Sequence, residues 1–598
     1  MNRQKSGIIA SLLFLSIYFA NSCANTTAPP SGGLKDTLAP ILISVNPDSN
    51  SINFPRQKAK IELKFDEFIV LKEPERAILL SPPQRRRPVA KVRGKSILVD
   101  IPEKLDSATT YTLYFGNSIE DNNENNKFPP YRYSFSTGDY IDSMLATGLI
   151  VDATTLLPVS GALIAFYADR SDSALYKKFP SAVTKSDQWG YFLATNLKSV
   201  PYRVFAYTDG NFNNMYNPEN EKVAFLDTLF TPATVMKKGM EELKYVDVKD
   251  TNASLARKHQ FQLYLFREEG RKQLVRNYER LSQRMMFAKF NAPEVKIDSI
   301  GFEGIDSSSV LKQFNIKNDS LVLWINEKIA KVPDTLFLNI RYYKTDSLNV
   351  LKLTRERLKF VAPRVKKAES NTRDKQNVPR ADLLKVTIEA VPSLIEKDGY
   401  KFEFPSPLSY MDTARIQFSS KTPKGVESKE EYSVSKDTAN MRVFFLKPKG
   451  KMFLGYDYIL TIPQGTFRDI YGFTNDTLTS TINLPKNDRL SRIDLKISGA
   501  DGYSYVIELI SQTRERVFRS YKIFYNTTLD FPYLEPGRYS IRVFRDVNGN
   551  GILDSGNIGE KRQPEMVRLY TLSSGSAIIE LKEGMDIEQK IDLKEIFR

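Results

Sequence analysis

The sequence predicts an all-β protein made of tandem β-sandwich modules. Short runs of alternating apolar and polar residues, separated by Asp, Asn, Gly and Pro, recur along the chain and are typical of half-buried strands. Aromatic residues favour strands, and the chain carries 30 Tyr and 36 Phe. Because its 598 residues exceed the size of one domain, we expect several modules, each with a core between two sheets.

Residues 1–22 are expected to form a secretory signal peptide. Arg3 and Lys5 precede an almost wholly apolar stretch from Ile8 to Ala20, which is too short to span a bilayer as a helix. The following residues, 23–39, are rich in small residues and Pro and are expected to form a tether.

Cys23 is the only cysteine in the chain, and it follows the segment Ala20-Asn21-Ser22. This sequence resembles a bacterial lipobox, although Asn21 is unusual there and Ala20 occupies a position that is usually Leu. The resemblance implies cleavage before Cys23 and attachment of lipid to its thiol. We then expect a firm anchor, because each buried methylene of an acyl chain contributes about 0.8 kcal/mol.

The composition argues against most classes of enzyme. A chain with one cysteine forms no internal disulfide, and His259 is the only histidine. Catalytic triads with His and His-based zinc sites therefore have at most one candidate member. We expect no enzyme, and a hydrolase that uses two carboxylates, as glycosidases do, is the least favoured alternative.

The chain is basic, with 86 Lys and Arg against 71 Asp and Glu and a formal net charge of +15. The charge is scattered and an exported protein rarely meets nucleic acid, so we do not expect nucleic acid as a partner. The densest cluster, Arg85-Arg86-Arg87, is expected in a loop between strands. The expected partners are the membrane, through the lipid anchor, and envelope polysaccharide or other envelope proteins.

The first module is expected at 40–137. Within Lys60 to Glu67, alternation by two places Ile61, Leu63 and Phe65 on the inner face of a strand. Further strands are expected at Ile41 to Val45, Tyr111 to Phe115 and Tyr131 to Phe135.

One segment of the tether, Pro30 to Thr37, and two of the first module, Phe65 to Phe68 and Tyr111 to Phe135, resemble surface-layer-type bacterial Ig-like domains. Their order is most similar to the start of Bacteroidetes outer-membrane lipoproteins, and the resemblance covers roughly 40–137. It implies an Ig-like sandwich in an envelope protein, and it supplies no catalytic residues.

The second module is expected at 143–247. Its strand-like segments are Ala146 to Ala153, Leu157 to Ala162, Ser186 to Phe192 and Tyr202 to Tyr207. Together they resemble the carboxypeptidase regulatory-like, prealbumin-type sandwich, which implies a non-catalytic module. In that pattern Gly161 and Gly190 fit tight turns, where a residue without Cβ is tolerated.

A more polar region follows at 248–283 and is expected to connect two modules. It contains a predicted helix over Glu268 to Leu281, because Leu274, Tyr278 and Leu281 recur at helical spacing. A third β-sandwich is expected at 284–363, and a linker rich in Lys, Arg, Asn and Asp at 364–382.

Two further modules repeat the first two. An Ig-like domain is expected at 383–485, because Tyr458 to Ile462 followed by Asp469 echoes Tyr111 to Phe115 followed by Asp121. A prealbumin-like sandwich is expected at 488–598. Its residues Asp546, Asn548, Asn550 and Asp554 align with Asp209, Asn211, Asn213 and Asn217 of the second module.

The loop of the last module is a candidate calcium site. Side-chain oxygens of Asp546, Asn548, Asn550 and Asp554, with the Ile552 carbonyl, are spaced as in an EF-hand-like loop. Only two of these ligands are charged and the twelfth position is Asn, so we expect weak binding, with a Kd on the order of millimolar. In the alternative interpretation, Asp and Asn form Asx-turns without an ion. No cofactor is required, and weakly bound calcium is the only candidate.

We therefore expect a non-catalytic cell-envelope lipoprotein of tandem Ig-like modules that acts as a structural, spacer or adhesion-type protein. Two alternatives stay open, a lipoprotein that binds carbohydrate or another surface polymer and the carboxylate-based hydrolase. The expected location is the outer membrane, by lipid anchor, with the periplasm-facing and cell-surface orientations both open.

Overall fold

The computed structural model describes residues 36–237, 240, 258–270, 272–347, 350–363, 383–392, 395, 399–484 and 490–598. Regular structure in these ranges is almost entirely strand, from β1 to β41. The described α-helices are single turns, α2 (Pro74–Ala77), α3 (Ala174–Lys177) and α6 (Leu593–Ile596). The predicted all-β class is confirmed. No helix among the described residues is long and apolar enough to cross a membrane.

Several predicted features lie outside the described residues. They are the signal peptide 1–22, Cys23, the tether up to residue 35, and the linker 364–382.

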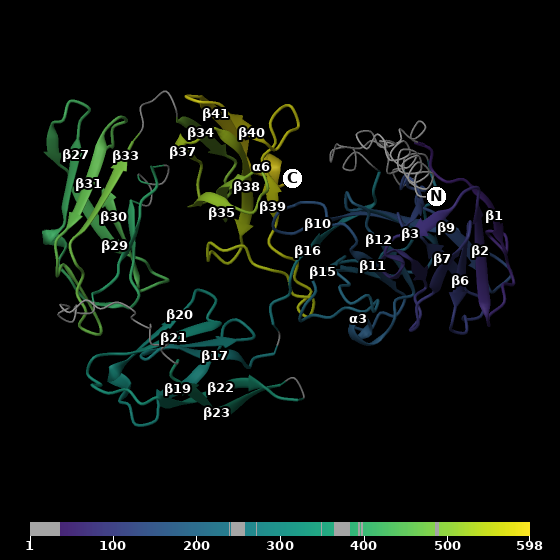
Figure 1. Ribbon diagram of the computed structural model, residues 1–598, viewed down its shortest axis with the longest axis horizontal. Helices are drawn as coiled ribbons and strands as arrows, with labels where there is room; N and C mark the ends of the chain where they lie inside the picture. Colours follow the sequence, from purple (N-terminus) through teal and green to yellow (C-terminus); the bar gives the residue numbers. More distant parts are fainter. Residues whose placement is uncertain are drawn as a thin grey trace, which may run out of the picture.

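Module 1 (residues 42–136) holds three sheets around one core, drawn in purple in Figure 1. Its strands are β1 (Leu42–Asn46), β2 (Ala59–Phe65), β3 (Ile69–Leu71), β4 (Leu79–Ser81), β5 (Val89–Arg93), β6 (Ser96–Ile101), β7 (Thr110–Tyr114), β8 (Ile119–Asp121) and β9 (Arg132–Ser136). The strand orders are β1-β2-β6-β5, β4-β7-β9 and β3-β8. In β2, the side chains of Ile61, Leu63 and Phe65 are buried between more exposed neighbours, as the alternation predicted.

Module 2 (residues 144–265) is a two-sheet sandwich. Its strands are β10 (Met144–Asp152), β11 (Leu163–Tyr167), β12 (Ala182–Lys185), β13 (Tyr191–Leu197), β14 (Arg203–Tyr207), β15 (Val223–Phe225) and β16 (Phe261–Leu265). The strand orders are β13-β10-β16 and β12-β11-β14-β15, and β16 runs parallel to β10. A strand of this sandwich thus comes from within 248–283, the region expected to be a connector.

Module 3 (residues 275–361) begins inside the same region. Its strands are β17 (Val275–Ser282), β18 (Met285–Phe290), β19 (Ile297–Phe302), β20 (Val310–Phe314), β21 (Ser320–Ile325), β22 (Thr335–Thr345) and β23 (Leu351–Val361), with a 3₁₀ turn η1 (Ser307–Ser309). The strand orders are β17-β18-β21-β20 and β19-β22-β23.

The helix predicted over Glu268 to Leu281 is wrong, because the second half of that segment is the edge strand β17. Its backbone pairs antiparallel with β18. Tyr278 and Leu281, which suggested a helical stripe, are both exposed. The buried residue is Arg280, whose guanidinium donates to the carbonyls of Pro333 and Asp334, at 2.9 Å each. These partners are distant in sequence, so local periodicity did not reveal them.

Module 4 (residues 387–483) has the strands β24 (Thr387–Glu389), β25 (Tyr400–Glu403), β26 (Leu408–Met411), β27 (Gln417–Lys421), β28 (Glu427–Lys429), β29 (Tyr432–Lys436), β30 (Val443–Pro448), β31 (Asp457–Ile462), β32 (Phe467–Asp469) and β33 (Leu478–Asn483), with a 3₁₀ turn η3 (Thr413–Arg415). The strand orders are β24-β25-β30-β29, β28-β27-β31-β33 and β26-β32. Apart from the added β28, these strand orders match those of module 1.

Module 5 (residues 491–592) has the strands β34 (Ser491–Ser498), β35 (Ser504–Ser511), β36 (Val517–Ile523), β37 (Thr527–Leu534), β38 (Gly537–Asp546), β39 (Val567–Leu569), β40 (Ile579–Leu581) and β41 (Asp586–Asp592). The strand orders are β37-β34-β41 and β36-β35-β38-β39, and β41 runs parallel to β34. The same parallel pairing in β10 and β16 shows that modules 2 and 5 repeat one fold, as predicted.

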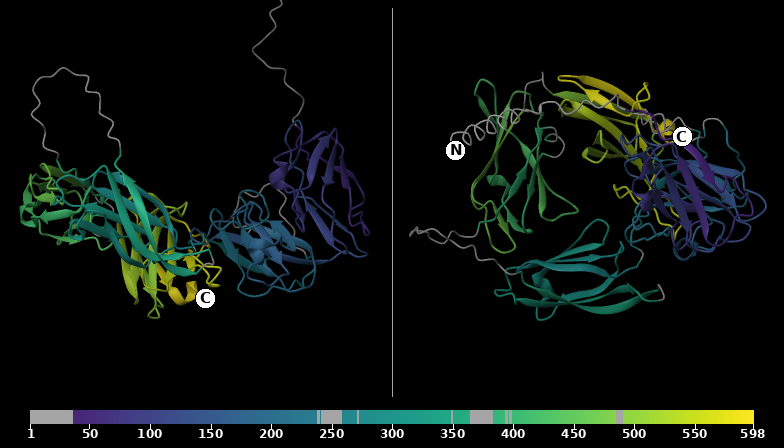
Figure 2. Two further views of the ribbon diagram at one scale, coloured as in Figure 1. Left: turned by 90° about the horizontal axis from the view of Figure 1, so that it is seen from below. Right: turned by 45° about the vertical axis from the view of Figure 1, so that its right-hand side comes forward.

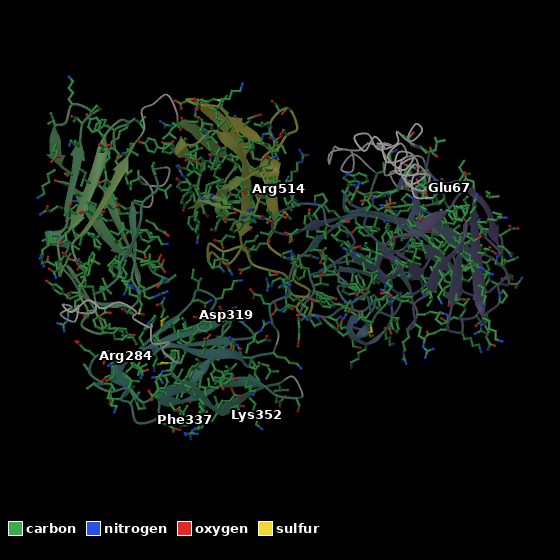
Figure 3. All side chains as sticks on the ribbon, viewed as in Figure 1. Glu67, Arg284, Asp319, Phe337, Lys352 and Arg514 are labelled. Carbon is green, nitrogen blue, oxygen red and sulfur yellow. The ribbon has the colours of Figure 1, made fainter. Side chains whose placement is uncertain are left out.

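The modules do not form a straight string. In Figures 1 and 2, modules 2 to 5 follow one another around a closed path, so that module 5 (yellow) returns to module 2 (blue). Modules 3 and 4 meet where the Arg284 guanidinium, labelled in Figure 3, lies 5.7 Å from the ring centre of Tyr471. Modules 4 and 5 meet where the Tyr533 hydroxyl donates to the Met452 carbonyl at 3.4 Å.

Gly190 is required by its turn, and Gly161 provides a matched control. Both have positive φ, 76° and 72°. A Cβ at Gly190 would lie 2.3 Å from the carbonyl oxygen of Ile150, whereas one at Gly161 meets no atom within 4 Å. We expect Gly161→Ala to lower the free energy of unfolding by about 1–2 kcal/mol, the cost of a left-handed residue, and Gly190→Ala to lower it by clearly more. Urea unfolding measures both, and equal losses would contradict the assigned clash.

Candidate functional site

The predicted calcium loop begins at a buried carboxylate. Asp546 is the last residue of β38 and is 1% exposed. Its Oδ2 atom accepts hydrogen bonds from the Ser504 hydroxyl and the Gly551 N–H, both at 2.9 Å, and lies 3.5 Å from the Lys522 ammonium. Its Oδ1 atom has no hydrogen-bond partner. The strand end therefore holds one satisfied and one unsatisfied carboxylate oxygen.

The other predicted ligands follow in a tight turn. Asn548 Oδ1 accepts the Asn550 N–H at 3.0 Å, and Asn550 Oδ1 accepts the Ile552 N–H at 2.7 Å. Both side-chain amides donate to Asp554 Oδ2, at 2.6 and 3.1 Å. The structure thus brings the predicted side chains together. The two bonds from backbone N–H groups to Asn548 Oδ1 and Asn550 Oδ1 are the Asx-turns of the alternative interpretation.

Glu565 belongs to the same loop and was missed from the sequence. Its Oε1 accepts the Val547 N–H at 2.7 Å and its Oε2 accepts the Asp554 N–H at 3.0 Å, so one carboxylate joins both ends of the turn. Burial raises the pKa of Glu565, the two N–H groups oppose this, and nearby Asp554 and Asp546 raise it further.

The sequence of module 2 contains a counterpart of Glu565 that could have indicated its role. There Glu221 accepts the N–H of Gly210 and of Asn217, at 3.1 and 2.9 Å, which are the equivalent positions. Three residues separate Asn217 from Glu221, but ten separate Asp554 from Glu565. The insertion moved the glutamate far from the position, thirteenth from the first Asp, that Glu221 occupies in module 2.

The equivalent carboxylate of module 2, Asp209, is fully engaged. Its Oδ1 accepts the Asn213 N–H and its Oδ2 the Asn214 N–H, at 2.9 and 3.0 Å. The Arg87 guanidinium lies 3.9 Å from Oδ2. Among the described residues, no group of three or more His, Cys, Asp or Glu side chains is arranged to hold a metal ion.

The insertion in module 5 docks this module on module 2. We call residues 547–566, between β38 and β39, the clasp loop. Its Ile558 is 7% exposed and packs in the core of module 2, and its N–H donates to Glu268 Oε1 at 2.9 Å. At Gly556 the backbone runs so close to Phe266 that a Cβ would lie 2.6 Å from the ring.

Module 2 inserts into module 5 in return. Leu156, in the turn after β10, packs against Val506, Phe544 and Val567. Beside it, Arg514 of module 5, labelled in Figure 3, donates to the Thr155 carbonyl at 3.0 Å. The two modules thus exchange one apolar side chain each.

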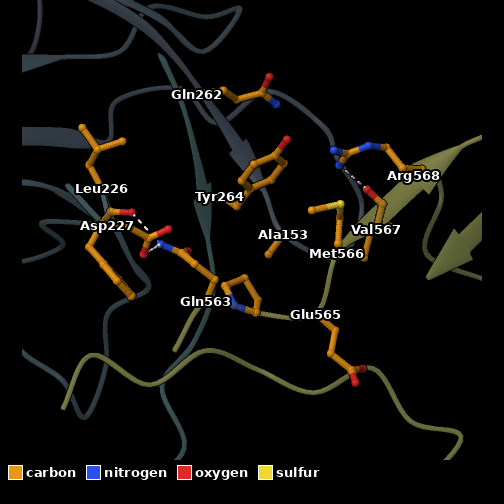
Figure 4. A pocket seen from close by; sticks show the side chains of 12 residues that line it. Ala153, Leu226, Asp227, Gln262, Tyr264, Gln563, Glu565, Met566, Val567 and Arg568 are labelled. Atoms are coloured by element: carbon orange, nitrogen blue, oxygen red, sulfur yellow. Dashed lines mark hydrogen bonds between the residues drawn. The ribbon is translucent and has the colours of Figure 1, made fainter. Parts of the chain in front are cut away.

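A cavity of about 220 Å³ lies beside this contact. Figure 4 shows Tyr264 of module 2 opposite Met566 of the clasp loop, and a hydrogen bond of 2.8 Å from Gln563 to Asp227 at its edge. Glu565 also lines it. Both carboxylates accept hydrogen bonds, Asp227 from Gln563 and Glu565 from both ends of the turn.

The basic cluster Arg85-Arg86-Arg87 lies in the loop between β4 and β5, as predicted. Arg87 packs over the Phe212 ring of module 2, with 5.4 Å from its guanidinium carbon to the ring centre. Lys185 lies nearby, and burial lowers its pKa to about 8, with Arg87 lowering it further and Asp209 opposing. Arg87 and Lys185 therefore lie at the contact between modules 1 and 2.

Comparison with known proteins identifies one module. A family model described as a bacterial Ig-like domain matches residues 36–137. No curated protein matches the chain. The chain therefore contains a bacterial Ig-like domain within a tandem β-sandwich protein.

Three solved structures have weak similarity to the chain. The Bacillus anthracis TIE protein is 10% identical, with 94% of this chain and 76% of that chain covered and a TM-score of 0.11. Domains 1–6 of the surface layer protein SbsC are 11% identical, covering 91% and 68%, with a TM-score of 0.13. A structure of Escherichia coli alpha-2-macroglobulin spanning domains MG0-NIE-MG1 is 11% identical, covering 53% of this chain and 96% of that chain, with a TM-score of 0.13. At such TM-scores these similarities carry no argument.

Charging Ile558 should release module 5 from module 2. A carboxylate in the core of module 2 costs several kcal/mol unless it is paired, so we expect Ile558→Asp to open the closed path. Small-angle X-ray scattering should then give a larger radius of gyration. Val547→Asp is the control, because Val547 lies in the same loop and is 73% exposed. An unchanged radius for Ile558→Asp would contradict the docking role.

Lys185 should make stability depend on pH. Because its pKa falls from 10.5 unfolded to about 8 folded, the unfolded chain binds more protons between these values, and the free energy of unfolding rises with pH. We expect a gain of up to about 2 kcal/mol between pH 8 and pH 9.5, measured by urea unfolding at these two pH values. Lys185→Met should remove the gain, and an unaltered slope would contradict the assignment.

Proposed function

We propose that this chain is a lipid-anchored, non-catalytic protein of the bacterial cell envelope, in which β-sandwich modules act as a scaffold, spacer or adhesion element. The observation that carries the proposal is the position of the bacterial Ig-like match, 36–137, directly after a lipobox-like Cys23 and a short tether. The order of parts supports an outer-membrane lipoprotein of the Bacteroidetes type.

Modules 2 and 5 are proposed to be carboxypeptidase regulatory-like, prealbumin-type sandwiches. Their common topology supports this, including the parallel pairs β10/β16 and β34/β41. We propose that these two modules pack against each other as a pair and that neither is catalytic.

A non-catalytic role is supported by what the buried carboxylates do. Asp121, at the end of β8, accepts four backbone N–H groups of residues 123–126. Burial alone would raise its pKa, but these bonds outweigh burial and hold the pKa below its usual value. Asp469, at the matching position in module 4, accepts the N–H of Tyr471 and Phe473 at 2.9 Å each. These carboxylates shape loops.

A scaffold role is favoured over polymer binding. Sugar-binding modules often display exposed aromatic platforms, but both tryptophans of the chain are buried, Trp189 at 7% and Trp324 at 1% exposure. The two tryptophans therefore offer the carbohydrate-binding alternative no exposed platform.

The tether limits how far the modules extend from the lipid. Sixteen residues, 24–39, reach at most roughly 55 Å when fully extended. Module 1 is therefore proposed to lie close to the bilayer, with the other modules beyond it. The periplasmic and cell-surface orientations are separated by protease shaving of intact cells, which degrades only a surface-exposed protein.

Cys23→Ser should release the protein from membranes. Without the thiol no acyl chains are attached, and the described residues offer no helix able to span the bilayer. We expect the variant in the soluble fraction after cell lysis and without incorporation of labelled fatty acid, while Ser31→Ala in the tether stays in the membrane fraction. A Cys23→Ser protein that pellets with membranes as before would refute lipid anchoring.

A further inference from the structure

One carboxylate oxygen at the start of the clasp loop is buried without a partner. The Asp546 side chain is 0% exposed. Its Oδ2 atom accepts the Gly551 N–H from across the turn, which directs the carboxylate into the loop, while Oδ1 has no hydrogen bond. Leaving a buried charged oxygen unsatisfied costs several kcal/mol. A cation inside the turn would remove this cost.

Further oxygens line the same turn. Asn548 Oδ1 and Asn550 Oδ1 each accept one backbone N–H. An amide oxygen has two lone pairs, so each retains one for a second partner. Both side-chain amides donate to Asp554 Oδ2, at 2.6 and 3.1 Å, so the Asp554 carboxylate lies within hydrogen-bond distance of both residues. Hard divalent cations bind such sets of carboxylate and amide oxygens.

The local charge also favours a cation. Glu565 bonds to both ends of the turn, so three carboxylates border it. The Lys522 ammonium lies 3.5 Å from Asp546 Oδ2 and donates to the Gly549 carbonyl of the turn, so it competes with a bound ion. In the described residues the acidic side chains do not by themselves form a three-membered metal cluster. An ion here would therefore be bound by the carboxylates of Asp546 and Asp554 and by amide and carbonyl oxygens. The Glu565 carboxylate, bonded to both ends of the turn, supplies the third negative charge.

We propose that the loop Asp546 to Asp554 binds one Ca²⁺ ion and that this ion holds the clasp loop in the shape that docks on module 2. The docking residue Ile558 lies on the insertion between Asp554 and Glu565. Both ends of this insertion are therefore set by the turn that takes the ion. We expect a Kd between about 0.1 and 1 mM, as in other extracellular calcium modules.

Module 2 supplies an internal control. In its equivalent loop, both oxygens of Asp209 accept backbone N–H groups, at 2.9 and 3.0 Å, and Arg87 lies 3.9 Å away. A cation there would relieve no unpartnered oxygen of that carboxylate, and the nearby guanidinium charge would oppose it. The proposal therefore requires one bound ion per chain, although the chain has two similar loops.

Calorimetric titration of the full mature chain with CaCl₂ tests the site. We expect one ion per chain and at least tenfold weaker binding for Asp546→Asn and Asp554→Asn, with unchanged binding for Asp209→Asn. Lys522→Met removes the competing ammonium and should bind about threefold more tightly or better, which tests the site without deleting a ligand. No binding up to about 10 mM, tenfold above the weakest expected Kd, would overturn the proposal, as would full binding by Asp546→Asn.

Hydrogen exchange tests the link between the ion and docking. Peptides that cover 555–564 contain the Ile558 N–H, which is bonded to Glu268. We expect at least tenfold slower exchange in saturating calcium than in chelator for the wild type and Asp209→Asn, and no difference for Asp546→Asn. Calcium binding that leaves exchange of these peptides unchanged would overturn the proposed link to module 2.

Discussion

The contact between module 5 and module 2 is the interaction on which the arrangement of the other modules depends. Leu156, which is partly buried, packs in module 5, and the buried Ile558 packs in module 2. Full burial of an aliphatic side chain contributes about 1.5–3 kcal/mol, and partial burial contributes less. The cost of closing a loop grows only slowly with its length, so a few such contacts suffice across the long intervening chain. Modules 3 and 4 are thereby held in a closed path.

Modules 2 and 5 illustrate how a repeated fold acquires a new role by insertion. In both, a strand leads into a turn that begins with Asp and is rich in Asn, and a glutamate, Glu221 or Glu565, bonds to the two ends of that turn. In module 5 the added residues between Asp554 and Glu565 reach the neighbouring module. The turn that both modules share holds the two ends of the insertion, so the insertion extends from module 5 in a defined direction.

Carboxylates at strand ends have a common structural use throughout the chain. Asp121, Asp209 and Asp469 each follow or end a strand and accept at least two backbone N–H groups of the next loop. Such bonds satisfy donors that a loop would otherwise leave without partners. Asp546 departs from this use, since one of its oxygens stays without a partner.

The sequence by itself determined the all-β class, the inner faces of strands such as β2, and the repeats of modules 1 and 4 and of modules 2 and 5. These features depend on side-chain alternation and on turn residues, which act over a few neighbours. The tertiary structure decided that β17 is a strand, because the carbonyls that bind Arg280 lie about 50 residues away. It also decided that Glu565, displaced by an insertion, belongs to the Asp546 turn and that Ile558 enters module 2. Contacts between modules depend on how whole sandwiches meet, and no local pattern encodes that.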